Sequence, residues 1–81
     1  MCLMTVDEKL EAARTLRRLP EPYLRRTLRV AAGIAQVDVA EHCGVSRETV
    51  ARWENGTRTP SGDRLLRYSR LMNRLAEEVA R

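Results

Sequence analysis

Residues 35–61, AQVDVAEHCGVSRETVARWENGTRTPS, are the most constraining stretch of this 81-residue chain. Two short amphipathic segments, 36–43 and 47–55, are separated by Gly44-Val45-Ser46. Gly44 is expected at a helix C-cap, where glycine accepts a positive φ, and Ser46 is a favourable N-cap for the next helix. A short turn containing glycine joins two helices at a steep angle. The stretch therefore predicts two helices packed nearly at right angles.

The apolar positions of both segments indicate how these helices pack. Val39 and Cys43 lie four residues apart and share one helix face. Ala40 is expected where the helices approach most closely, because a larger side chain would push them apart. Val50 and Trp53 are three residues apart and are expected to point inward. Trp53 is therefore interpreted as a core residue rather than as a surface on which the rings of a partner stack. The fluorescence of its indole should change when the protein binds a partner.

The stretch from Leu24 to Leu75 resembles the lambda-repressor-like, Cro/Xre-type helix-turn-helix family. The parts that carry the resemblance are Gly33 to Gln36, Gly44-Val45-Ser46, and Trp53-Glu54-Asn55-Gly56 followed by Pro60. Ala35 departs from the family pattern, which usually has Ser or Thr as the cap there. The resemblance implies a small all-α domain that binds double-stranded DNA, with its helix-turn-helix at residues 36–55.

Further helices are expected on both sides of this pair. Thr5 and Glu8 have the spacing of a capping box, and the helix they begin should run to about Leu19. Its apolar stripe consists of Val6, Leu10, Ala13 and Leu16. Pro20-Glu21-Pro22 ends that helix, and Pro22 can begin the next one. The second helix should end near Ala32 and Gly33, with an inner face of Leu24, Leu28 and Ala31 or Ala32.

The C-terminal part begins at Thr59-Pro60-Ser61 and is expected as a single helix to about Ala80, or as two helices broken near Asn73. The fold class is thus all-α: a small five-helix lambda-repressor-like domain with an extra N-terminal helix and a long C-terminal helix. Residues 1–21 form a capping or interaction helix, 22–75 the DNA-binding domain, and 76–81 the end of the last helix. All three parts are expected to form one compact unit.

Size and charge limit the functions that fit. A chain of 81 residues makes one domain and buries only about 60% of its unfolded surface, so no separate catalytic or ligand-sensing domain is expected. The net charge of +4 favours an anionic partner. All but one of the basic residues are arginine, which suits phosphate and guanine but equally reflects GC-rich coding.

The N-terminal end of the 47–55 helix is expected to read base edges in the major groove. Arg47 is placed to bind guanine O6 and N7, and Arg52 to read a second base or a phosphate. Glu48 either accepts from cytosine N4 or, as we favour, pairs with Arg52 at i,i+4. Thr49 can offer its methyl group to thymine. The alternative for each residue is an ordinary solvated helix face.

Phosphate contacts position such a domain without specifying sequence. Gln36 begins its helix, where free amides and the positive dipole end favour an anion, and the resemblance implies that it binds phosphate and buttresses Arg47. The resemblance also implies that a loop grips the DNA backbone through side chains and amides. The predicted phosphate contacts are Gln36, Ser46, Asn55, Thr57 and Arg58. Arg25 and Arg26 either add longer-range attraction or lie on a solvated face.

Two further sets of residues are expected to act away from the DNA. The resemblance implies that Arg29 and Glu54 form a partly buried ion pair between the first helix of the family core and the end of the recognition helix. The apolar stripe of the last helix is the candidate dimer or partner surface, alone or together with the first helix. Alternatively, both stripes cover the core of the monomer. The residues of the last-helix stripe are Leu65, Tyr68, Met72, Leu75 and Val79.

The sequence offers no catalytic arrangement, so an enzyme, a cofactor and a metal site are not expected. His42 stands beside Cys43 without zinc-ligand spacing and is expected to be exposed near a helix C-terminus. Cys2 and Cys43 are expected as reduced thiols of a cytoplasmic protein. Residues 1–4 are too quickly interrupted by Asp7 and Glu8 for a signal peptide, and no membrane span or membrane partner is expected.

Three functions remain open at this point. The first is a repressor of the small phage or mobile-element type in a bacterial cytoplasm, acting as a homodimer on a palindromic operator. The second is an antitoxin-like module whose extra helices bind a partner protein, with autoregulatory DNA binding. The third is an interaction module that has kept the fold but has lost DNA binding.

Overall fold

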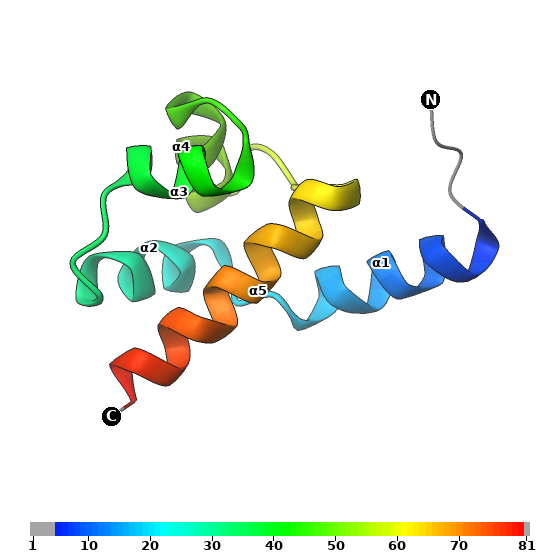
Figure 1. The fold of residues 1–81 in the computed structure, drawn as a ribbon, viewed down its shortest axis with the longest axis horizontal. Coiled ribbons are helices and arrows are strands. Elements are labelled where there is room, and N and C mark those ends of the chain that lie inside the picture. The colour runs from blue at the N-terminus through cyan, green and yellow to red at the C-terminus, as the bar shows by residue number, and fades with distance from the viewer. Residues whose placement is uncertain (1–4, 81) are drawn as a thin grey trace.

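The computed structural model describes residues 5–80, which fold into five helices and contain no strand. The helices are α1 (Val6–Arg18), α2 (Pro22–Ala31), α3 (Gln36–Cys43), α4 (Arg47–Asn55) and α5 (Gly62–Val79). Helices α2, α3 and α4 gather around the long α5, whereas α1 lies to one side (Figure 1). The all-α, five-helix prediction is therefore confirmed. Of the two alternatives for the C-terminal part, the single helix is the one found.

Side-chain hydrogen bonds at the N-caps mark where α1, α3 and α4 begin. The Thr5 hydroxyl accepts from the Glu8 amide at 3.1 Å, as the capping-box spacing predicts. The Ser46 hydroxyl accepts from the Thr49 amide at 3.2 Å at the start of α4. Ala35 has no side chain that can cap α3, but the Asp38 carboxylate accepts from the Ala35 amide at 3.0 Å. This bond, from the N-cap amide to the side chain three residues later, is one of the two bonds of a capping box, and it fixes the chain where α3 begins.

The turn between α3 and α4 has the conformation that its sequence predicts. Gly44 adopts a φ of 72°, a left-handed conformation that is strained for residues with a Cβ. Val39, Ala40 and Cys43 of α3 are buried, and so is Val50 of α4. The helix-turn-helix is therefore held by close packing of small and medium side chains.

Helix α5 supplies the centre of the core. Four of its side chains, Leu65, Tyr68, Met72 and Leu75, are at most 4% exposed. The Tyr68 ring packs against Trp53 with centroids 4.7 Å apart and planes tilted by 47°. The hypothesis that this stripe forms a dimer or partner surface is wrong for these four residues, because they are enclosed within one chain. Of the five residues proposed for that surface, Val79 alone stays exposed.

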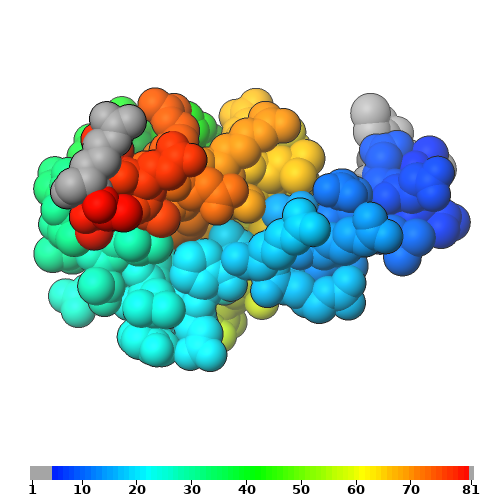
Figure 2. All heavy atoms as spheres, turned by 90° about the horizontal axis from the view of Figure 1, so that it is seen from below, coloured from blue at the N-terminus to red at the C-terminus, as the bar shows by residue number. Residues whose placement is uncertain are grey.

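Helix α1 packs with a face that the sequence pattern did not indicate. Its contact with α5 is made on the side of Ala12 and, just past its end, of buried Leu19. The apolar stripe of this helix therefore does not cover the core, which was one of its two expected roles: Val6 is 73% and Leu10 54% exposed, and Ala13 is exposed as well. The start of α1 projects beyond the body of the molecule (Figure 2). An apolar face of α1 is thus left open.

Helix α2 also departs from its expected inner face. Leu28 and Ala32 pack against the core as predicted, but Leu24 is 40% exposed. The buried positions one turn apart are Arg25 and Arg29. The aliphatic parts of the two arginines take the place that the pattern assigned to leucine.

Candidate nucleic-acid interface

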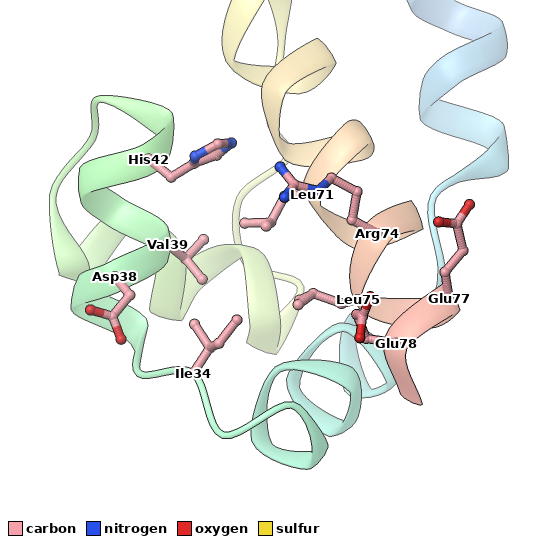
Figure 3. A pocket seen from close by; sticks show the side chains of 9 residues that line it. All are labelled: Ile34, Asp38, Val39, His42, Leu71, Arg74, Leu75, Glu77 and Glu78. Carbon is pink, nitrogen blue, oxygen red and sulfur yellow. The ribbon is translucent and has the colours of Figure 1, made fainter. Parts of the chain in front are cut away.

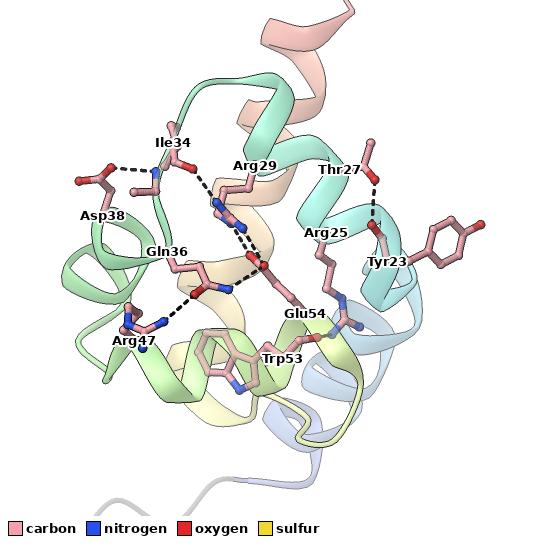
Figure 4. A network of polar contacts seen from close by, with 11 residues as sticks. Tyr23, Arg25, Thr27, Arg29, Ile34, Gln36, Asp38, Arg47, Trp53 and Glu54 are labelled. Atoms are coloured by element: carbon pink, nitrogen blue, oxygen red, sulfur yellow. Dashed lines mark hydrogen bonds and ion pairs between the residues drawn. The ribbon is translucent and has the colours of Figure 1, made fainter.

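A chain of polar contacts runs from the core to the outer surface of the helix-turn-helix (Figure 4). It begins at the ion pair of Arg29 with Glu54, in which Arg29 Nε lies 2.6 Å from Glu54 Oε2 and Arg29 Nη2 lies 3.0 Å from Oε1. Gln36 Nε2 donates to the same Glu54 Oε1 at 3.1 Å. Arg47 Nη1 then donates to Gln36 Oε1 at 3.1 Å. Four side chains from α2, α3 and α4 are joined in this order.

The inner end of this chain is buried, and each charge there has a partner. Arg29 is 8% and Glu54 6% exposed. Hydrogen bonding to Glu54 raises the pKa of Arg29 and outweighs the opposing effect of burial. Arg29 Nη1 also donates to the Ile34 carbonyl at 2.9 Å, which fixes the loop leading into α3. The ion pair between α2 and α4 that the family resemblance implied is thus present, and it is two-pronged and buried rather than partly buried.

Arg25 is a second buried arginine, for which only surface roles were predicted. Its Nε donates to the Pro20 carbonyl at 2.8 Å, and its Nη1 donates to the Trp53 carbonyl at 3.0 Å. The expected roles in long-range attraction or on a solvated face are wrong for Arg25, because it is 8% exposed. It holds the α1–α2 corner against the end of α4. Arg26, the neighbouring position, is exposed.

The outer side of α4 presents the residues expected to read bases. Arg47, Glu48 and Arg52 are exposed. Glu48 Oε1 lies 3.8 Å from Arg47 Nη2. The expected i,i+4 ion pair of Glu48 with Arg52 is not formed. The pair with Arg47 is exposed on both sides, so it is weak and can be exchanged for a contact with DNA. Thr49 is half-buried, and its hydroxyl lies 2.9 Å from that of Ser46.

The loop after α4 is organised by its own polar groups. Asn55 Oδ1 accepts from the Thr57 amide at 3.0 Å and from the Thr57 hydroxyl at 2.6 Å. The amides of Thr57 and Arg58 both donate to the Arg52 carbonyl, at 3.1 and 3.3 Å. In this conformation the amides of Thr57 and Arg58 and the side chains of Asn55 and Thr57 are thus all engaged within the loop. Contact of the loop with phosphate stays a prediction.

The remaining candidates lie away from this surface. His42 is exposed near the C-terminus of α3, as expected. Cys43 is buried, and burial raises the pKa of its thiol. Cys2 lies outside the described residues. Within residues 5–80, no cluster of His, Cys, Asp or Glu is placed to hold a metal ion.

A comparison with protein families decides what this geometry belongs to. A family model described as helix-turn-helix, of the Cro/C1 type, matches residues 26–79, which are two thirds of the chain. The chain belongs to this helix-turn-helix family. It is accordingly a DNA-binding transcriptional regulator. No curated protein and no solved structure matches the chain. No helix within residues 5–80 is both long and apolar enough to cross a membrane.

The polar network was only partly readable from the sequence. Arg29, Glu54 and Gln36 were singled out through the family pattern, but the direct bond from Gln36 to Glu54 was missed. So was the burial of Arg25. The signal for Arg25 was its spacing, because it lies four residues before Arg29 and therefore on the same helix face.

Proposed function

We propose that this helix-turn-helix protein is a sequence-specific repressor of the small phage or mobile-element type that acts in a bacterial cytoplasm. Two copies would read the half-sites of a palindromic operator, with the N-terminal end of α4 in the major groove. The observation that carries the proposal is the polar chain ending at Arg47. An exposed arginine normally samples many rotamers, whereas this one is tethered through Gln36 to a buried ion pair. A tethered guanidinium is suited to bidentate recognition of guanine.

In this proposal, residues on the same surface divide into base and phosphate contacts. Arg47 reads guanine, with Glu48, Thr49 and Arg52 as the other base contacts. Glu48 exchanges its weak pair with Arg47 for a cytosine amino group. The phosphate contacts proposed are Ser46, Asn55, Thr57 and Arg58, together with the start of α3 at Gln36. Both polar atoms of the Gln36 side chain are already engaged, so its main role is to hold Arg47.

Selection of binding sites from random duplex DNA, at a stated salt concentration, tests the proposal. We expect an enriched half-site, repeated as an inverted pair about 34 Å apart or a multiple of that distance. Selected duplexes should bind at least about a thousandfold more tightly than random ones at physiological salt. Selection without any enriched sequence would contradict sequence-specific reading, and a single unpaired half-site would contradict the palindrome.

An antitoxin-like module is the second candidate. The open apolar face of α1, with Val6 73% exposed, is the observation that favours a protein partner. The antitoxin would be supported by a toxin-like reading frame beside the gene. The product of that frame should bind this chain and should no longer bind the Leu10→Glu variant. Unchanged binding of such a product to the Leu10→Glu variant would exclude α1 as its docking face.

A further inference from the structure

A groove lies between α3 and the C-terminal half of α5, on the side of α5 away from α1. Its volume is about 470 Å³. Half-buried Ile34 and Leu71 form the accessible part of its apolar floor, above the buried core residues Val39 and Leu75 (Figure 3). Charged and polar side chains form both walls, including Asp38 and His42 on α3 and Arg74 and Glu77 on α5. A groove of this kind, apolar at the bottom and charged at the rim, fits one face of an amphipathic helix.

The charge of the groove changes sign along its length. His42 and Arg74 also line a second hollow of about 380 Å³, together with Arg67, Arg70 and Leu71. Asp63 pairs with Arg67 at 2.9 Å. Arg70 and Arg74 form no ion pair with any residue of the described chain, so this end is basic. Asp38, one turn before His42, and Glu77, one turn after Arg74, make the other end acidic.

Helix α1 carries the opposite charge order beside its open apolar face. Asp7, Glu8 and Glu11 lie in its N-terminal half together with a single base, Lys9, and Arg14, Arg17 and Arg18 lie in its C-terminal half. Glu8 and Glu11 border the contact of α1 with α5, and exposed Glu11 lies 3.9 Å from Arg14 in a weak surface pair. Val6, Leu10 and Ala13 share the outward face because they follow each other at helical spacing. The helix has 13 residues and is therefore about 20 Å long, enough to extend along the groove.

We propose that the outer face of α1 from a second copy of this chain docks in the groove between α3 and α5. The N-terminal half of α1 lies at the basic end, where Asp7 and Glu11 meet Arg70 and Arg74. The basic half of α1 lies toward Asp38 and Glu77. Leu10 covers the apolar floor near Leu71.

The proposed exchange is reciprocal: each copy offers one α1 and one groove to the same partner, so that a two-fold axis relates two equal contacts. One helix-in-groove contact alone is small for a stable complex, and the reciprocal pair doubles the buried area. The dimer joins α1, which lies outside the matched residues 26–79, to a groove that lies within them. The dimer would supply two copies of α4, one for each half-site of the proposed palindrome. Because the dimer is tested without DNA, either proposal can fail alone.

Charge reversal on the two faces tests this dimer. One variant carries Asp7→Arg and Glu11→Arg, and the other carries Arg70→Glu and Arg74→Glu. In either homodimer both contacts then bring like charges together. In the mixed dimer both contacts are again complementary, because a basic α1 meets an acidic groove and the unchanged α1 meets the unchanged groove.

Light scattering at about 50 µM protein should give a dimer for the unchanged chain, monomers for each variant alone, and a one-to-one heterodimer for their mixture. Helical circular dichroism checks that each variant is folded. Arg64→Glu, a reversal on α5 outside the groove, should leave the dimer intact. A monomeric unchanged chain, homodimers of the reversed variants, or folded variants that stay monomeric when mixed would each overturn the proposal.

A variant that changes no charge tests the same contact if a charge-reversed variant fails to fold. Leu10→Ala removes apolar contact and favours helix, and it should raise the dimer dissociation constant at least about tenfold. Its matched control is Val30→Ala, at an exposed apolar residue of α2 outside the groove. An equal effect of both substitutions, or no effect of Leu10→Ala, would also overturn the proposal.

Discussion

Gln36 accepts a hydrogen bond from Arg47 at 3.1 Å while its amide nitrogen holds Glu54 at the same distance. Gln36 is therefore the link between a buried ion pair and an exposed arginine. Gln36→Ala should leave Arg47 present but untethered. We expect the preference for a selected duplex over a random one to fall by about tenfold. Without Gln36, the Arg47 guanidinium is free to rotate and must lose that freedom when it binds a base.

The control for this prediction is Glu41→Ala, an exposed position of the same helix that lies outside the polar chain. Binding of both variants to selected and random duplexes is measured by the change in Trp53 fluorescence or by gel shift. Should Gln36→Ala keep the full preference, Arg47 does not depend on its tether.

The buried ion pair should be costly to break from one side. Glu54→Leu leaves Arg29 buried without its partner, and we expect the free energy of unfolding to fall by about 3–5 kcal/mol. Arg29→Met combined with Glu54→Leu removes both charges and should recover much of that loss. Urea unfolding of the single and double variants measures the coupling. Equal losses in both variants would show that the pair contributes through packing alone.

Tyr68 presents the opposite case, a buried polar atom without a partner. Its ring is fully buried against Trp53, and its hydroxyl forms no hydrogen bond with the described residues. Tyr68→Phe removes only that hydroxyl, so the variant should be more stable by about 1 kcal/mol. Urea or thermal unfolding checks this. A loss of stability of similar size would indicate that the hydroxyl has a partner, for instance a bound water.

The thiol of Cys43 should make stability dependent on alkaline pH. Burial raises its pKa above the ordinary value of 9.0, the effect of nearby Arg67 being smaller. The folded state therefore binds the thiol proton more tightly than the unfolded state does. This contribution is complete below pH 9 and is lost as the pH rises through the folded pKa. Above pH 9, the free energy of unfolding should therefore fall less steeply with pH in Cys43→Ala than in the unchanged chain. The same slope in both proteins would contradict a contribution from this thiol.

How far the sequence predicts this molecule depends on the range of each interaction. Gly44 and Ser46 specify their turn locally, and the fold around them was predicted correctly. The apolar stripe of α1 correctly indicated an amphipathic helix, but no pattern within one helix tells which element covers it. Helix α5 instead meets α1 on the side of Ala12.

The burial of Arg25 was missed for a similar reason. Its acceptor, the Trp53 carbonyl, lies 28 residues away in sequence, and its position depends on how α2 and α4 pack. The ion pair of Arg29 with Glu54 spans nearly the same separation, yet it was expected because the family pattern includes it. Long-range polar contacts of this chain were thus predictable only where a resemblance supplied them.

The most direct test of base reading by α4 compares Arg47→Ala with Arg58→Ala on selected and random duplexes over a range of salt concentrations. Arg47→Ala should lower the preference for the selected duplex by about 1–3 kcal/mol and change random binding little. Arg58→Ala should weaken binding to all duplexes alike and reduce the salt slope by about one unit. An Arg47→Ala variant that keeps the full preference of the unchanged chain would contradict base reading by α4.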